Sequence, residues 1–332
     1  MKRPVFFYAF ILILAVALGV VGYKFVKQKN LPPLQELFTQ AEKLRAGGAV
    51  LDAAAQYDAF WDGYAKTELA PQALYYAGTC KFLVGVNCPG IKEFDQKKAG
   101  LADAKKKEYQ ACLDYLKSQK KAFAYDDKID KYLYQGTEFE KLIKDYPASD
   151  LVDDAAFQLV RTKIAAQQQQ KTLNAGGMLQ QYAEFFQKYP QSPFRKDGVE
   201  DLSKLVAEAP DPLPDHKALV ASYQKLAPAA KDFPELGKLA YVLGKKLLKE
   251  GDPANAAAIF GVPALLGIGV VETQQTRLNI RGGPDTAQKV VTKANKGEEV
   301  LILEKTGQWY RIQLQDGVTG YARNDFIKVN PK

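Results

Sequence analysis

The stretch "TRLNIRGGP", residues 276–284, decides the fold of the C-terminal part of this 332-residue chain. Leu278 and Ile280 alternate with polar residues, which is the pattern of a strand with one face in a core. Two glycines and a proline follow at once, and this combination favours a turn. The stretch therefore predicts a first strand and its turn, and it contains no catalytic group.

The chain after Val271 continues in the same strand-rich manner. Short β-rich runs alternate with turn signals such as Asp316-Gly317, and helical spacing is absent. About sixty residues with five or six short strands are typical of a small closed barrel, which leaves few strand edges open. The predicted strands are 276–281, 288–293, 299–305, 308–314, 318–322 and 325–329.

This C-terminal region resembles the bacterial SH3-like domain. The resemblance rests on "LNIRGGP" at 278–284, on "WYRI" at 309–312 and on "GY" at 320–321. It implies an all-β SH3-like small barrel over 270–332 that binds a cell-wall peptide, such as one from peptidoglycan, or a protein partner. Eukaryotic relatives bind proline-rich peptides, but Arg323 stands where they carry a groove proline, so that ligand class is not expected.

The segment around Trp309 supplies the candidate binding residues. A period of two places Tyr310, Ile312 and Leu314 in the core and leaves Trp309 on the outer face. An outward indole either covers a loop or contacts a ligand, and both interpretations remain open. As a ligand contact it would suit a peptide with a carboxylate, because a nearby guanidinium can pair with the charge. The predicted ligand-binding residues are Trp309, Arg311, Arg281 and Arg323.

The N-terminal segment 4–23 contains twenty residues without a charge. As a helix it would be about 30 Å long, which is the thickness of a bilayer's hydrocarbon core. The sequence thus predicts a transmembrane signal-anchor within residues 1–30, with a cleaved signal peptide as the alternative. Basic residues flank both ends, so the flanking charges do not give the orientation. We expect a single-pass inner-membrane protein with its C-terminal domains in the periplasm; a cytoplasm-facing, membrane-tethered adaptor is the alternative.

Three stretches in the middle of the chain align without a gap. In each, an aromatic residue precedes a tyrosine by seven positions, so both rings share one face of a helix. In two of them Tyr-Pro follows and ends the helix, and a serine then offers a cap for the next one. This pattern predicts helical hairpins stacked as a solenoid, with the aromatic rings in the core. The aromatic pairs are Tyr57 and Tyr64, Phe139 and Tyr146, and Tyr182 and Tyr189.

The same region resembles tetratricopeptide repeats of bacterial cell-envelope proteins. Gly47-Gly48 stands where that family turns between helices, and Tyr-Pro-x-Ser is its usual phrase between repeats. The resemblance implies a TPR-like all-α array over 31–265 that binds envelope proteins. Tyr146 and Tyr189 are 43 residues apart and Tyr64 and Tyr146 are 82 apart, so one diverged unit should fill about 95–135.

The cysteines form an odd set of three: Cys80, Cys88 and Cys112. A zinc site would need four ligands, and the single histidine, His216, is remote in sequence. We therefore expect no metal site. In an oxidising compartment two thiols should pair, and Cys80 with Cys88 is the candidate disulfide; three unpaired thiols are the alternative.

Charge and motifs exclude other function classes. Of the net charge of +8, five basic residues lie within the first 30, whereas residues 31–270 balance at 31 basic and 31 acidic. A nucleic-acid-binding face is not expected from this distribution. No phosphate-binding loop or serine-nucleophile elbow is visible, so we expect neither an enzyme nor a cofactor. The expected function is that of a membrane-anchored periplasmic scaffold with two kinds of binding module.

Overall fold

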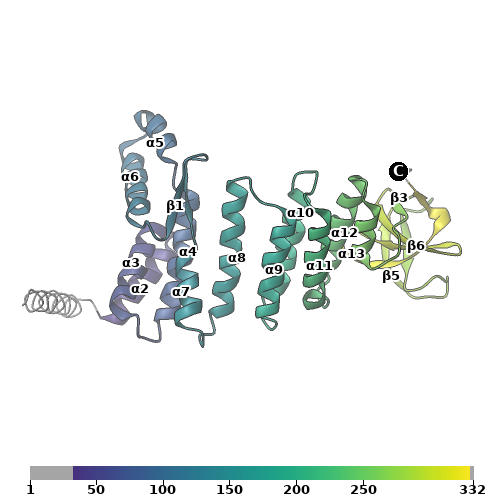
Figure 1. Ribbon diagram of the computed structural model, residues 1–332, viewed down its shortest axis with the longest axis horizontal. Helices are drawn as coiled ribbons and strands as arrows, with labels where there is room; N and C mark the ends of the chain where they lie inside the picture. Colours follow the sequence, from purple (N-terminus) through teal and green to yellow (C-terminus); the bar gives the residue numbers. More distant parts are fainter. Residues whose placement is uncertain (1–32, 330–332) are drawn as a thin grey trace, which may run out of the picture. The chain divides into compact units, whose positions relative to one another are not determined.

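A computed structural model describes residues 33–329. The chain divides into two compact units, the first ending at Thr162 and the second beginning at Lys163. Helices occupy the chain up to residue 260, except for one hairpin, and a β-sheet follows (Figure 1). This order fits the predicted helical region followed by an all-β domain. The predicted domain boundaries stay predictions.

The membrane-spanning part of the prediction needs correction. Among residues 33–329, no helix is both long enough and apolar enough to cross a bilayer. This finding does not support an architecture that includes a transmembrane helix, nor a single-pass inner-membrane localisation. The segment 4–23, on which both predictions rested, lies outside the described residues. The architecture is therefore corrected to a helical region and a β-domain.

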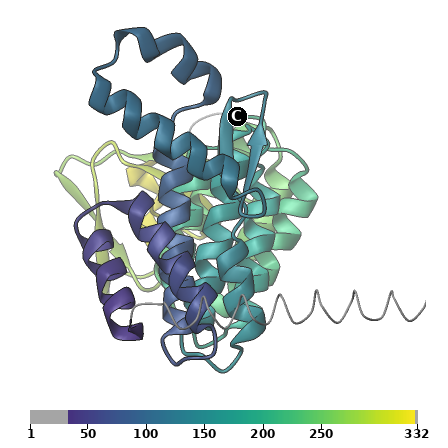
Figure 2. The ribbon, with the colours of Figure 1, turned by 90° about the vertical axis from the view of Figure 1, so that its left-hand side faces the viewer.

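The first unit is helical apart from one hairpin. Strands β1 and β2 of this hairpin pair antiparallel, and they fall inside the stretch where a diverged helical repeat was expected. Figure 2 shows α5 and α6 as an excursion of the chain beside the hairpin. The elements are α2 (Leu34–Ala46), α3 (Val50–Tyr64), α4 (Ala70–Asn87), α5 (Ile91–Lys97), η1 (Lys98–Gly100), α6 (Asp103–Ser118), β1 (Phe123–Asp126), β2 (Lys131–Tyr134), α7 (Thr137–Asp145) and α8 (Val152–Gln169), which continues past the division.

The disulfide in this unit differs from the predicted pair. Cys88 caps the C-terminus of α4 and bonds to Cys112 of α6, with 6.1 Å between the two Cα atoms. Cys80 is unpaired and buried. Cys80 and Cys88 lie eight residues apart along one helix, so their Cα atoms are roughly 12 Å apart, beyond the reach of a disulfide. The distance set by the helical rise thus rules out the predicted Cys80–Cys88 bond.

The aligned aromatics occupy the helix cores as their spacing predicts. The first ring of each pair is buried: Tyr57 is 0%, Phe139 1% and Tyr182 1% exposed, and their tyrosine partners are half-buried. Gly198 makes room for the ring of Tyr182, since a Cβ on Gly198 would lie 2.9 Å from that ring. The rings therefore stabilise the packing between helices.

Tyr-Pro ends the helices as expected, but Ser192 does not cap the helix that follows. Helix α7 and helix α9 (Ala175–Lys188) both end at the residue before their Tyr-Pro dipeptide. Ser192 then accepts a hydrogen bond from the backbone N–H of Phe194 at 3.3 Å, and Phe194 is the residue just before α10. The hydroxyl thus orders the turn that precedes the helix rather than the first helical turn itself. Together, the twelve α-helices of the described chain are consistent with a helical repeat region.

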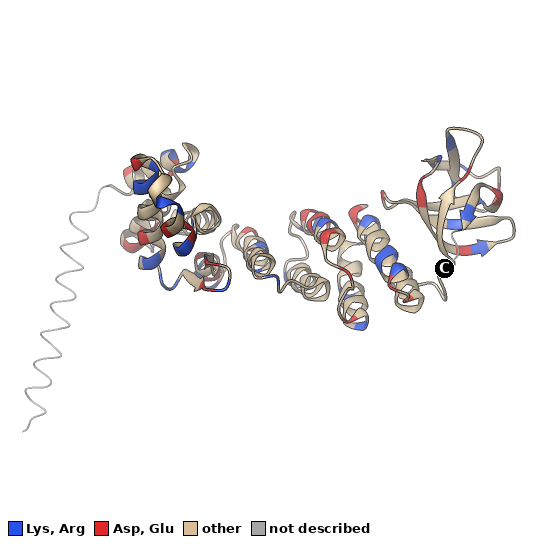
Figure 3. Cartoon of the chain, turned by 90° about the horizontal axis from the view of Figure 1, so that it is seen from above, with Lys and Arg blue, Asp and Glu red and all other residues tan. Residues whose placement is uncertain are grey.

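The second unit begins with helices packed in two layers. Helices α9, α11 and α13 pack in succession, and α10 packs on α12 (Figure 1). Figure 3 shows basic and acidic residues interleaved along these helices. The helices are α9 (Ala175–Lys188), α10 (Arg195–Glu208), α11 (His216–Ala230), α12 (Glu235–Lys249) and α13 (Pro253–Phe260).

The β-domain of this unit is one antiparallel sheet of seven strands in the order β5-β4-β8-β7-β6-β3-β9. Its core contains Leu278 and Ile280 of the opening stretch together with Ile312 and Leu314. The strands are β3 (Gly267–Val271), β4 (Arg277–Arg281), β5 (Val290–Asn295), β6 (Glu299–Thr306), β7 (Trp309–Gln313), β8 (Thr319–Arg323) and β9 (Ile327–Val329).

Strand β3 was not predicted, and it joins two strands far apart in sequence. It pairs with β6 on one side and β9 on the other. A Cβ on Gly269 would lie 2.6 Å from Ile327 and 2.9 Å from Ile302. The glycine thus lets two isoleucines fill the core beneath this strand.

The β-domain is fastened to α12 within the same unit. The side chain of Gln313 donates hydrogen bonds to the backbone oxygens of Gly237 at 3.2 Å and Gly317 at 2.7 Å. A Cβ on Gly237 would lie 2.4 Å from the Gly317 oxygen, so the two backbones approach closely only because both residues are glycine. This contact explains why Gln313 is buried although strand periodicity puts it on the outer face.

Candidate functional site

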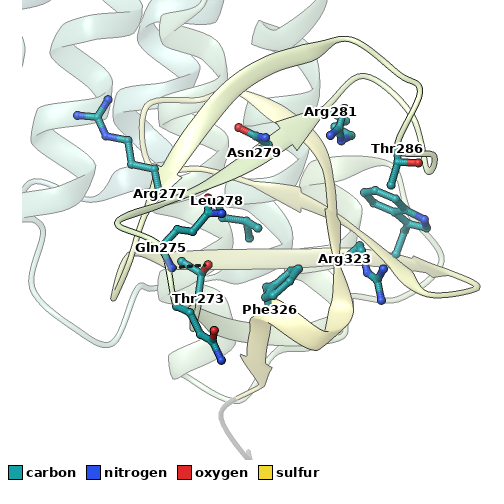
Figure 4. Close-up of a pocket in the computed structure, with 11 residues that line it drawn as sticks. Thr273, Gln275, Arg277, Leu278, Asn279, Arg281, Thr286, Arg323 and Phe326 are labelled. Atoms are coloured by element: carbon teal, nitrogen blue, oxygen red, sulfur yellow. Dashed lines mark hydrogen bonds between the residues drawn. The ribbon is translucent and has the colours of Figure 1, made fainter.

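The candidate site is a groove on the β-domain with a volume of about 370 Å³. The connection from β3 to β4, the outer face of β4, and residues next to the ends of β7 and β8 form its walls (Figure 4). The residues that line it are Thr273, Gln274, Gln275, Arg277, Leu278, Asn279, Arg281, Thr286, Trp309, Arg323 and Phe326.

Strand pairing brings three of the four predicted ligand-binding residues into this groove. Trp309 and Arg323 are opposite each other in the register of β7 and β8. Arg281 ends β4 and is paired with Tyr321 of β8, two residues before Arg323. The half-buried indole and two guanidinium groups therefore meet at one end of the groove.

The fourth predicted residue, Arg311, does not line the groove. It lies on β7 opposite Tyr321 and forms an ion pair with Glu304 of β6 at 3.3 Å. Arg311 is separated from Trp309 by one residue, so the two Cα atoms are about 7 Å apart along the strand. The charge of Arg311 is thus compensated by Glu304 within the sheet. Tyr321 is half-buried on the same outer face because Gly320 and Ala322 take the inward positions.

The residues at the other end of the groove were not predicted from the sequence. Arg277 and Asn279 lie there on the outer face of β4, and Thr273 and Gln275 come from the preceding loop (Figure 4). The Thr273 hydroxyl accepts a hydrogen bond from the backbone N–H of Gln275 at 3.3 Å, which orders this loop. The opening stretch did contain a sign of them. Arg277, Asn279 and Arg281 alternate with the inward residues of the strand, and this alternation places all three on its outer face.

The three arginines differ in how their charges are compensated. Arg323 donates two hydrogen bonds to the Asp325 carboxylate, at 3.1 and 2.8 Å. Arg281 donates to the backbone oxygen of Gln288 at 2.8 Å, which ties together the ends of the loop 282–289 but neutralises no charge. Arg277 makes no hydrogen bond or ion pair with any residue between 33 and 329. No acidic residue lines the groove, so two cationic charges remain uncompensated in it.

A second cluster of chemical groups lies in the first unit. Lys81 is 2% exposed and forms ion pairs with Asp58 at 2.8 Å and Glu138 at 2.7 Å. Burial alone would lower the pKa of Lys81, but the charges of Glu138 and Asp58 outweigh it and raise this pKa. Tyr115 donates to Asp58 and Tyr134 donates to Glu138, so each carboxylate has further partners. The charged groups of this cluster are therefore all bound to one another or to the two tyrosines.

The remaining candidate groups are also held by structural partners. Cys80 is buried, and burial raises the pKa of its thiol to about 11, which keeps it protonated and unreactive near neutral pH. His216 lies between Asp252 and Glu250, with each ring nitrogen 2.7 Å from a carboxylate oxygen. Within residues 33–329 no group of three or more histidine, cysteine, aspartate or glutamate side chains is placed to hold a metal ion.

Comparison with known proteins agrees with the C-terminal fold. A family model described as "Bacterial SH3 domain" matches residues 276–328, and these residues are a bacterial SH3 domain. The match runs from β4 into β9 and excludes β3. No curated protein matches the chain. A bacterial SH3 domain suggests a module that binds a protein or the cell wall.

Proposed function

We propose that this chain is a non-enzymatic binding protein whose SH3 domain holds a cell-wall peptide or an acidic segment of a protein in the groove beside Trp309. The observation that carries the proposal is the composition of the groove. An indole and three arginines line the groove, no acidic residue lines its walls, and two of the cations lack a carboxylate partner. Such a surface favours a ligand with a carboxylate and a contact for the ring.

The Trp309 side chain supplies the contact area in this proposal. It is half-buried, so one side rests against the domain and the other remains accessible to a ligand. Aromatic residues in such positions commonly dominate the free energy of binding. The neighbouring Phe326 adds a second half-buried ring to the groove, and it packs against the core of the domain.

The experiment is retention of the full chain on purified cell wall, with Trp309→Ala as the test variant. Tyr321→Ala is the matched control, because Tyr321 is another half-buried aromatic on the outer face that does not line the groove. We expect Trp309→Ala to lose most of the retention and Tyr321→Ala to keep it. If Trp309→Ala is retained as well as the control, the groove is not the binding site.

We further propose that the helical region binds a second protein, so that the chain acts as a scaffold. The packing of α9, α11 and α13 in one layer and of α10 and α12 in the other supports this, since stacked helical hairpins present a continuous face to a partner. Because a wall-binding module would hold the chain in the cell envelope, this second partner is an envelope protein. A chain truncated before Gly267 tests this assignment, because the helical region alone should still capture the partner protein. If the truncated chain no longer captures the partner, the helical region is not the binding part.

A further inference from the structure

We propose that the ligand of the groove is an extended peptide with two carboxylates four residues apart, one bound at Arg277 and the other at Arg281. This inference rests on the proposed function and specifies its ligand. The structural basis is the row of three outward side chains on β4: Arg277, Asn279 and Arg281 (Figure 4). Leu278 and Ile280 between them are buried, so the alternation along this strand is complete.

The spacing of this row follows from the strand itself. An antiparallel strand rises about 3.4 Å per residue, so the Cα atoms of Arg277 and Arg281 are roughly 13 to 14 Å apart. An extended peptide has the same rise, and its side chains at positions i, i+2 and i+4 lie on one side. Carboxylates at i and i+4 would therefore face Arg277 and Arg281 together, with position i+2 opposite Asn279. Carboxylates on adjacent residues would point to opposite sides and could not.

The ion pairs within the domain also indicate that Arg277 and Arg281 are the arginines that would bind the ligand carboxylates. Arg277 and Arg281 have no carboxylate partner within the described chain, whereas Arg323 is already paired with Asp325. A ligand carboxylate at Arg323 would compete with Asp325, but at the other two it would meet an uncompensated guanidinium. Trp309 on β7 and Phe326 after β8 supply the apolar contact of the groove and do not belong to the row on β4.

The polar end of the groove can bind the peptide backbone. Gln275 is exposed and lines the groove next to Arg277, and Asn279 is exposed at the middle of the row. Side-chain amides can both donate to carbonyl oxygens and accept from N–H groups. These residues thus offer partners to the backbone groups of an extended segment, which has no internal hydrogen bonds to satisfy them.

The test measures the affinity of the full chain for four capped pentapeptides by fluorescence anisotropy. The first is Glu-Val-Thr-Val-Glu, with carboxylates at i and i+4, and Glu-Glu-Thr-Val-Val is its isomer of equal charge with adjacent carboxylates. Gln-Val-Thr-Val-Glu and Glu-Val-Thr-Val-Gln each retain one. We expect the spaced peptide to bind about five- to tenfold more tightly than its isomer, the gain typical of one further charge-assisted contact.

Variants then assign each carboxylate to its arginine. Arg277→Gln should lower the affinity for the spaced peptide by about five- to tenfold, to the level of the single-carboxylate peptides. Arg311→Gln is the matched control, because Arg311 is an arginine of the same domain outside the groove, and it should change nothing. Equal affinity for the spaced peptide and its isomer, or an equal effect of Arg277→Gln and Arg311→Gln, would overturn the inference.

The outcomes separate this inference from the proposed function. If Trp309→Ala abolishes binding of all four peptides but the spacing of the carboxylates has no effect, the groove binds peptides and only the two-carboxylate inference fails. If Trp309→Ala binds every peptide as well as the wild type does, the groove itself is not the site and both fail. Competition by soluble cell-wall fragments then shows whether the wall occupies this row, and failure to compete assigns it to an acidic protein segment.

Discussion

Two groups of cationic side chains in this chain differ in nearly every physical respect. Lys81 in the first unit is 2% exposed and has two carboxylate partners. Arg277 and Arg281 in the SH3 domain are accessible and have none within the described chain. A buried, fully paired cation has no charge left for a ligand and serves to fix the packing around it. An exposed, unpaired cation contributes little to folding and is free to bind. The comparison assigns stability to the first group and recognition to the second.

The largest expected effect is on stability, from Lys81→Ala. This change leaves the carboxylates of Asp58 and Glu138 in the interior without their cation, and breaking a buried ion pair in this way costs about 3–5 kcal/mol of unfolding free energy. Urea denaturation measures the change. Lys97→Ala is the control, because Lys97 is 66% exposed in its pair with Glu93 and should cost less than about 1 kcal/mol. Equal stability of the two variants would contradict the assignment of a stabilising role to Lys81.

The next prediction separates folding from binding within the SH3 domain. Ile312 is 0% exposed in the core, so Ile312→Ala should destabilise the chain by about 2–5 kcal/mol. Trp309→Ala, three positions earlier on the same strand, should destabilise it much less and should lose retention on cell wall. Thermal unfolding and the retention assay are run on both variants. If Trp309→Ala unfolds the domain, the indole is structural and the site is elsewhere.

The third prediction concerns the disulfide between Cys88 and Cys112, which closes a loop with a sequence separation of 24 residues. A disulfide that closes a loop of this length stabilises the folded state by about 3 kcal/mol. The double variant Cys88→Ser with Cys112→Ser should therefore melt at a lower temperature, and reducing agent should affect the wild type but not the variant. Cys80→Ser tests the assignment of the free thiol, because it should leave the response to reducing agent unchanged. Binding at the groove should be the same in all of these proteins.

Sequence alone predicted the parts of this molecule that depend on local periodicity. The strand of the opening stretch and the inward positions of β7 follow from a period of two, and the buried rings of the aligned pairs follow from a period of seven. The outward position of Trp309, which lines the groove, follows from the same period of two. Each of these outcomes is set by neighbours within one element, which the sequence displays directly.

The features that were missed depend on the pairing between strands. Strand β3 reads as "GIGVV", and its two glycines suit a linker as well as a strand until Ile302 and Ile327 are seen to fill the space. The hairpin β1–β2 pairs only eight residues of a stretch expected to be helical. Arg311 was placed in the site because nothing in the sequence indicates that Glu304 lies beside it. The register between strands, which sequence does not give, decides all three.

The smallest expected effect comes from His216, which bridges Asp252 and Glu250 and lies outside the groove. A hydrogen bond to Asp252, opposed by partial burial and joined by a bond to Glu250, raises the pKa of His216 above its ordinary value. The folded state therefore binds the proton more tightly than the unfolded chain does. The resulting stabilisation is fully present below the ordinary histidine pKa of about 6.5 and is lost as the pH rises through the raised pKa of the folded state.

Melting temperatures of the wild type and of His216→Gln across this range measure the effect. The wild type should be the more stable by about 1 kcal/mol or less in mildly acidic solution, and the difference should shrink as the solution becomes alkaline. Other titrating groups act on both proteins, so the difference isolates the histidine. Peptide affinity should be equal in the two proteins at every pH, because the charges of His216 are paired like those of Lys81. A pH-dependent difference in peptide affinity would show that a compensated charge can control recognition, and the division between the two groups of cations would then fail.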